Sequence, residues 1–286
     1  MPKGNHFNFY KGEIMDFKKL LILFLTIMLI GGFVWADDAK PKVTITAPKT
    51  PGKLYLPSIN EIHRNAKHAG ITGKWGQLIR VQSKDYAAMK LPQRAFEVGQ
   101  TLSDIAFVVL DSGNDDAPPS KAIIQQAYNA LGSMELPANI KAEIQTLKDQ
   151  LETGKLQGKA LRDKMDDLIS QLVPQIEEDK KPSIRDAGSL VLAAGYFKAL
   201  YLGARTVASY TKPTPEQLDM FRWKALVDYF LTHFTAKAIP EFKDSRTVKN
   251  FVVALEKIKP LVNKNRGEIT KSDVKGIARA LKLSFK

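Results

Sequence analysis

Residues 183–209 read SIRDAGSLVLAAGYFKALYLGARTVAS, a run that is apolar almost all the way round a helix. A helix without a polar face normally lies at the centre of a protein, and the many Gly and Ala residues here would let neighbouring helices approach closely. A membrane span is a poorer interpretation, because Lys198 and Arg205 would each cost about 2.5 to 3.5 kcal/mol at the centre of a bilayer. The run therefore predicts a central helix of a soluble bundle.

A second stretch of the same kind occupies residues 92–111, PQRAFEVGQTLSDIAFVVLD. Apolar residues recur at helical spacing elsewhere too, in 140–151, 161–176, 248–262 and 274–281. The segments 140–151 and 161–176 fit either an antiparallel hairpin or one long helix broken at Gly154. No region is rich in strand signals. We therefore predict an all-α bundle of about seven to nine helices around two central apolar helices.

Several helix ends are marked in the sequence. Ser58 with Glu61, and Thr214 with Gln217, have the spacing of a capping box, in which a hydroxyl and a side chain three residues later satisfy free backbone N–H groups. Ser183 with Asp186, and Thr270 with Asp273, are looser versions of the same signal. Three glycines predict helix ends: Gly70 after Ala69, Gly132 after Leu131, and Gly267 after the run Lys264-Asn265-Arg266.

Residues 15–36 have the parts of a secretory signal peptide. Lys18 and Lys19 precede an apolar run, 20–33, and small residues end at Ala36. This pattern predicts cleavage near Ala36 and a periplasmic or secreted protein. The alternative is an uncleaved helix that anchors the chain in the inner membrane, since Val34 and Trp35 would lengthen the run.

The segments on either side of the signal have their own interpretation. Lys11-Gly12-Glu13 can be encoded by a purine-rich ribosome-binding sequence, so Met15 is the expected start and 1–14 an untranslated or non-native leader. A polar leader that is tolerated before the signal is the alternative. Prolines are dense in 37–57, which predicts an extended tether. Residues 58–286 then form a single all-α domain.

Charge is unevenly distributed. Residues 37–94 contain eleven Lys/Arg and four acids, residues 243–286 contain twelve and four, and the interval between them contains sixteen and twenty. Two basic regions therefore flank a mildly acidic one, which favours contact with an anionic surface; a solvated basic surface is the alternative. Export argues against nucleic acid as the partner.

Charged residues also occur in the two central segments. Lys198 and Arg205 are seven residues apart, and Glu97, Asp104 and Asp111 follow one another at the same interval. Each set therefore lies on one face of its helix. If both helices are central, the acidic and basic rows should meet, because an unpaired buried charge costs several kcal/mol. An ion pair that sets the register of the helices is one interpretation, and a polar ligand-binding or acid–base site is another.

Other chemistry has little support. The chain has no Cys, so it has neither disulfides nor a thiol nucleophile. His63 and His68 point in different directions on a helix, and His233 lies among aromatic residues, so no metal site and no cofactor are expected. The acidic segment 111–116 departs from the calcium-loop pattern and predicts a turn.

These observations predict a non-catalytic exported envelope protein. We expect it to bind an anionic partner, which is envelope lipid, a wall polymer or an acidic protein, through its basic terminal regions, and peripheral membrane contact is one form this could take. Alternatives are a small-ligand receptor or enzyme with its site at Glu97, Asp104, Lys198 and Arg205, and a subunit of an envelope assembly. The oligomeric state is open. The surface candidates are Lys74, Trp75, Arg246, Lys249, Lys271, Lys275 and Arg279.

Overall fold

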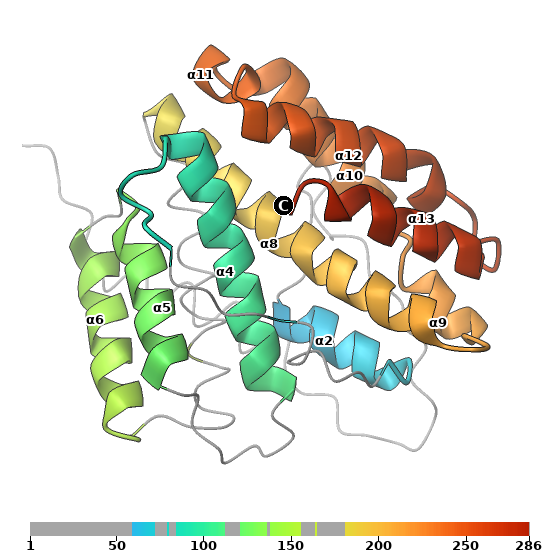
Figure 1. Cartoon of the computed structure of the whole chain (residues 1–286), viewed down its shortest axis with the longest axis horizontal. Coiled ribbons are helices and arrows are strands. Elements are labelled where there is room, and N and C mark those ends of the chain that lie inside the picture. The colour runs from blue at the N-terminus through green and yellow to red at the C-terminus, as the bar shows by residue number, and fades with distance from the viewer. Residues whose placement is uncertain are drawn as a thin grey trace, which may run out of the picture. The chain divides into compact units, whose positions relative to one another are not determined.

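The computed structural model describes residues 59–71, 79, 84–111, 121–135, 138–155, 164 and 181–285. Over these ranges the chain forms helices and turns and contains no β-strand, so the all-α prediction is confirmed (Figure 1). The predicted leader, signal peptide and tether lie outside the described residues. So does the segment 161–176, apart from Lys164.

The helices of the described ranges differ widely in length, and α4 and α8 are the longest of them. In chain order they are α2 (Ile59–His68), α4 (Leu91–Asp111), α5 (Lys121–Gly132), α6 (Ala138–Glu152), α8 (Pro182–Ser209), α9 (Pro215–Asp219), α10 (Lys224–Thr232), the π-helix η1 (His233–Lys237), α11 (Pro240–Lys243), α12 (Arg246–Val262) and α13 (Lys271–Lys282).

The two apolar segments form the centre of the described fold. α8 packs most extensively against α4 and then against α13, and α2 lies against both α4 and α8. α8 is the one helix in the described ranges that is long and apolar enough to cross a membrane, and most of its apolar stretch is buried against other helices. Central packing therefore accounts for its composition.

α4 and α8 run in the same direction (Figure 1). Gly99 lies against Val191 and Ala194, and Asp104 lies against Lys198 farther along both helices. A Cβ atom at Gly99 would lie 2.2 Å from the carbonyl oxygen of Val191. Glycine is therefore required there, because the two backbones are already in contact.

Aromatic side chains connect α8 to the C-terminal helices. The ring of Phe197 lies 6.1 Å from that of Phe230 on α10 and 5.4 Å from that of Phe251 on α12, both edge to face. All three are fully buried. Edge-to-face contacts of this kind add roughly 0.5–1.5 kcal/mol each to the free energy of burial, so they help fix α10 and α12 on α8.

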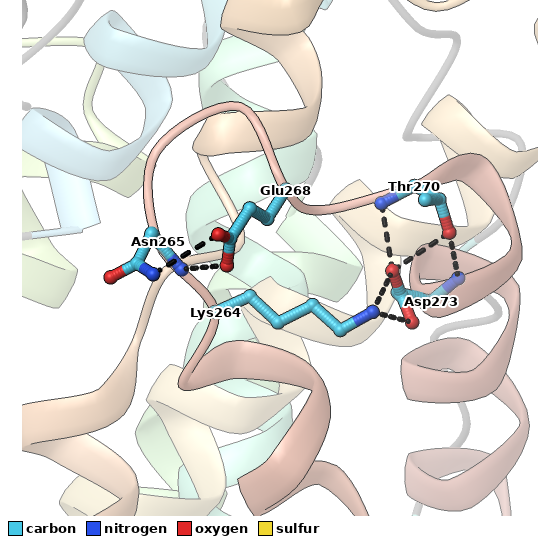
Figure 2. A network of polar contacts seen from close by, with 5 residues as sticks. All are labelled: Lys264, Asn265, Glu268, Thr270 and Asp273. Carbon is cyan, nitrogen blue, oxygen red and sulfur yellow. Dashed lines mark hydrogen bonds and ion pairs between the residues drawn. The ribbon is translucent and has the colours of Figure 1, made fainter.

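The turn between α12 and α13 is held by a compact polar network (Figure 2). Asp273 accepts hydrogen bonds from the backbone N–H and the hydroxyl of Thr270, and Lys264 donates to both of its carboxylate oxygens at 2.9 and 2.8 Å. Glu268 accepts from the backbone and side chain of Asn265. Burial alone would raise the pKa of Asp273, but the bonds from Lys264 and Thr270 outweigh it and lower that pKa.

The predicted helix starts agree with the structure in part. Capping boxes are present at Thr214 and at Thr270, and Ser58 lies outside the described residues. The cap predicted at Ser183 is wrong, because α8 begins at Pro182 without a side-chain capping bond and Asp186 accepts from the backbone N–H of Ile239 instead.

Gly70 follows the end of α2 with a φ of 71°, in the left-handed region that favours glycine. The end predicted at Gly267 is wrong: α12 already ends at Val262, and Gly267, with a φ of 78°, lies in the turn before α13. Gly132 is the last residue of α5. α6 ends at Glu152, and Gly154 has a φ of 67°, so the chain turns there rather than continuing as one helix.

Candidate functional site

One of the predicted charge pairs joins the two central helices. Nζ of Lys198 on α8 lies 3.2 Å from Oδ2 of Asp104 on α4, and the two side chains are 15% and 16% exposed. The other carboxylate oxygen of Asp104, Oδ1, is buried and has no hydrogen-bond partner within the described ranges. The pair is thus half-enclosed, with one oxygen left over.

A second ion pair lies beside the first. Lys84, in the segment before α4, pairs with Glu97. A hydrogen bond of 2.8 Å between the buried hydroxyls of Tyr86 and Thr101 holds that segment against α4. Glu97 is therefore paired within its own region of the chain instead of with the basic residues of α8.

Burial dominates the titration of the central carboxyl. Burial raises the pKa of Asp104 above its ordinary value, and the attraction of Lys198 and then Lys84 offsets this only in part. Asp104 therefore holds a proton more readily than an exposed aspartate does.

The C-terminal segment covers the lysine of this pair. The ring of Phe285 stacks on that of Phe96 at 5.7 Å and lies 5.6 Å from that of Tyr201. Nζ of Lys198 lies 5.5 Å from the centre of the Phe285 ring, within range of a cation–π interaction. The residues around Asp104 and Lys198 thus pack α4, α8 and the C-terminal residues against one another.

Arg205, the other predicted basic residue of α8, is exposed. Its guanidinium lies 5.7 Å from the centre of the Tyr201 ring, on its own helix. The side chain of Asp111 lies outside what the structure describes. Of the four residues predicted to form a polar site, the structure therefore brings together Asp104 and Lys198. Glu97 is paired with Lys84 instead, and Arg205 lies at the surface.

A further polar contact involves a histidine whose sequence neighbours indicated only an aromatic environment. Nε2 of His233 lies 3.1 Å from Oδ1 of Asp186, and Oδ2 of Asp186 accepts a 2.8 Å hydrogen bond from the backbone N–H of Ile239. Burial lowers the pKa of His233, and the attraction of Asp186 opposes this. Lys237 and Arg185 lower that pKa further.

Sequence reasoning missed this contact for a physical reason. Asp186 is in the first part of α8 and His233 begins the π-helix η1, so the two residues are far apart in the chain. A single wide π-turn has no distinctive residue pattern. The one available signal was an aspartate in a segment predicted to be central, which needs a partner.

The predicted surface residues fall into three groups. Lys249 pairs with Asp244 at 3.1 Å, where both are exposed, and Lys271 donates from Nζ to the carbonyl oxygens of Tyr210 and Thr211 at the end of α8. Lys74 and Trp75 lie outside the described residues. The remaining three are exposed, and they are Arg246, Lys275 and Arg279.

Two more exposed basic residues lie on the same helices, Lys257 on α12 and Lys282 on α13. We call the set Arg246, Lys257, Lys275, Arg279 and Lys282 the outer cationic face. None of the five forms an ion pair with a residue in the described part of the chain. The acidic residues of α12 and α13 are Glu256, which is exposed, and Asp273, which is buried and bonded to Lys264. Positive charge therefore predominates on these two helices.

Neither metal-binding geometry nor similarity to known proteins identifies a site. Among the residues whose positions the structure describes, no three His, Cys, Asp or Glu residues are grouped so that they could hold a metal ion. No family model, no curated protein and no solved structure matches this chain.

Proposed function

We propose that this protein is a non-catalytic, exported envelope protein that binds an anionic partner through the outer cationic face of the α12–α13 hairpin. The observation that carries the proposal is the set of five exposed cationic side chains without an ion-pair partner among the described residues. Charges of one sign on a rigid surface add to a potential that attracts polyanions over about a Debye length.

Two of the surface lysines predicted to bind the partner have contacts within the protein. Lys271 is occupied by the backbone carbonyls that end α8, and Lys249 has Asp244 beside it. The proposal therefore rests on Arg246, Lys275 and Arg279, with Lys257 and Lys282 added. Lys74 and Trp75 remain predicted contributors.

Export is part of the proposal and is supported by the sequence of residues 15–36. The measurement is mass spectrometry of the N-terminus of the protein recovered from cells that express the full chain. A first residue at Asp37 would agree with cleavage after Ala36. Peptides from residues 1–14 in the recovered protein would contradict both the proposed start at Met15 and the cleavage.

Binding is tested by removing charge from α13. In the triple variant Lys275→Gln, Arg279→Gln, Lys282→Gln, we expect weaker binding to soluble polyphosphate and to phosphatidylglycerol vesicles, and less dependence of that binding on salt. The matched control removes three exposed charges elsewhere, Lys212→Gln, Arg222→Gln and Lys224→Gln. Thermal unfolding of both variants checks that each is folded.

The possible outcomes differ in what they imply. Weakening in the α13 variant alone supports the proposal. Equal weakening in both variants shows that net charge, and not this face, determines binding. Wild-type protein that binds neither probe at low salt would overturn the proposal.

A further inference from the structure

We infer that the outer cationic face docks on an anionic lipid bilayer, with Val253 and Leu283 entering the headgroup region between the cationic side chains. This inference rests on the proposed function and names the partner. It commits to lipid because a soluble polyanion would use the charges alone.

The inference starts from the exposed apolar side chains. Across the described ranges, Val253 and Leu283 are the two large hydrophobic residues that are exposed, with 47% and 55% of their surface accessible. Single exposed apolar residues are common on soluble proteins. In this protein, however, both belong to the same hairpin, Val253 to α12 and Leu283 to the residue that follows α13.

Both residues lie on the solvent side of the hairpin, among its cations. Leu283 follows Arg279 by one helical turn and is adjacent to Lys282, while Ile277 and Leu281 on the opposite side are fully buried. Val253 lies one turn before Lys257 and two turns after Arg246. The buried side of α12 is occupied by other residues, Phe251, Leu255 and Ile258.

The antiparallel pairing of the two helices brings these positions to the same end of the hairpin. The hydroxyl of Ser284 donates to the carbonyl oxygen of Asn250 at 3.5 Å, while Lys264 bonds Asp273 at the other end. The end of α13 thus lies beside the first half of α12, where Val253 is. Leu283 and Val253 therefore lie at similar levels along the hairpin.

Exposed apolar side chains on the same helices as unpaired cations match the chemistry of a membrane interface. Acidic lipid headgroups attract Lys and Arg, and the boundary with the acyl chains accepts Val and Leu. Because a bilayer satisfies both kinds of side chain at once, it should bind this face more tightly than a soluble polymer of equal charge does.

The experiment reads insertion at single positions. Since the chain contains no Cys, Leu283→Cys, Val253→Cys and the control Lys224→Cys each provide one labelling site for an environment-sensitive nitrobenzoxadiazole fluorophore. Lys224 is exposed on α10, away from the hairpin sequence. Each labelled full chain is mixed with vesicles of phosphatidylglycerol and phosphatidylcholine, with vesicles of phosphatidylcholine alone, and with soluble polyphosphate. Because the readout is local, the apolar run 20–33 can bind a vesicle without producing the signal.

We expect a blue shift at 283 and 253, and quenching by nitroxide-labelled lipid, with the phosphatidylglycerol vesicles only. The label at 224 should not shift. The affinity for phosphatidylglycerol vesicles is obtained by titrating the shift of the label at 283. We expect this affinity to fall roughly a hundredfold, at about fivefold for each basic residue, in the triple variant Lys275→Gln, Arg279→Gln, Lys282→Gln.

Three results would count against the inference. Absence of a shift at 283 and 253, in a protein whose binding to polyphosphate and to vesicles still depends on Lys275, Arg279 and Lys282, would overturn the lipid inference and leave the proposed function standing. Equal shifts at 283, 253 and 224 would also overturn it. If the wild-type protein binds neither vesicles nor polyphosphate, the lipid inference and the proposed function are both overturned.

Discussion

Asp104 has one carboxylate oxygen paired with Lys198 and the other buried without a partner in the described part of the chain. Removing either member of the pair leaves the remaining charge half-enclosed and uncompensated. Such a charge costs more than the net contribution of the pair itself. The two residues should therefore be coupled in their effect on the free energy of unfolding.

We predict this coupling in a double-mutant cycle. Asp104→Ala and Lys198→Met should each lower the free energy of unfolding by about 1–3 kcal/mol, and the double variant should cost about 1–2 kcal/mol less than the sum of the two. Urea denaturation of the four proteins gives the coupling energy. Asp104→Ala combined with Arg205→Ala is the control, and those two changes should add, because Arg205 is exposed. Additive effects for Asp104 and Lys198 would contradict a direct contact.

Sequence spacing could predict part of this site. The interval of seven residues placed Asp104 on one face of its helix with the other acids, and Lys198 on one face of its helix with Arg205. Because both helices were predicted to be buried, each charge was expected to have a partner. The direction of α4 relative to α8 is set by packing, so the partner of each charge could not be derived. Glu97 illustrates this, because its partner Lys84 comes from the segment that the Tyr86–Thr101 hydrogen bond holds against α4.

Among the elements, α4 and α8 make a contact that depends on small residues. A Cβ at Gly99 would meet backbone atoms of α8, whereas one at Gly203 would have an ordinary contact with Phe221, at 3.7 Å. Substitution of glycine by alanine is therefore expected to have opposite effects on the free energy of unfolding at positions 99 and 203. Alanine is otherwise preferred over glycine within a helix by about 1 kcal/mol.

We predict that Gly99→Ala lowers the free energy of unfolding by roughly 1–3 kcal/mol, because the added methyl group forces the two helices apart. Gly203→Ala should leave it unchanged or raise it by up to about 1 kcal/mol. Chemical denaturation measures both. Equal effects of the two substitutions would show that α4 and α8 are not in backbone contact at Gly99.

Elements whose signals are local could be predicted closely. The capping boxes at Thr214 and Thr270 depend on residues three apart, so the sequence contains the whole interaction. The π-helix η1 could not be predicted in this way. It begins at His233 and is followed by Ile239, whose N–H is bound by Asp186 from a distant helix. The wide turn of η1 therefore coincides with a tertiary contact, and no local residue pattern indicates it.

At the scale of the whole described domain, packing dominates the interactions. One hydrophobic cluster combines buried residues of α2, α4, α5, α8 and the helices from α10 to α13. Polar contacts join the parts of this core at a few points, and Asp186 joins α8 to the chain at η1 and α11. A change in the charge of His233 would therefore act on the contact between the central helix and the C-terminal helices.

We predict that the domain loses stability in mild acid through His233. Because burial lowers the pKa of His233 in the folded state, the unfolded chain binds the proton more tightly. The free energy of unfolding should then be constant above about pH 6.5, the ordinary pKa of histidine, and fall as the pH decreases toward the lowered pKa. The slope from one such group is at most about 1.4 kcal/mol per pH unit. Urea denaturation from pH 7.5 to 5 measures it; His233→Gln should flatten this slope, whereas His68→Gln, at an exposed position, should retain it. If the free energy of unfolding of His233→Gln depends on pH as steeply as that of the wild type, the folded state does not favour the neutral form of His233.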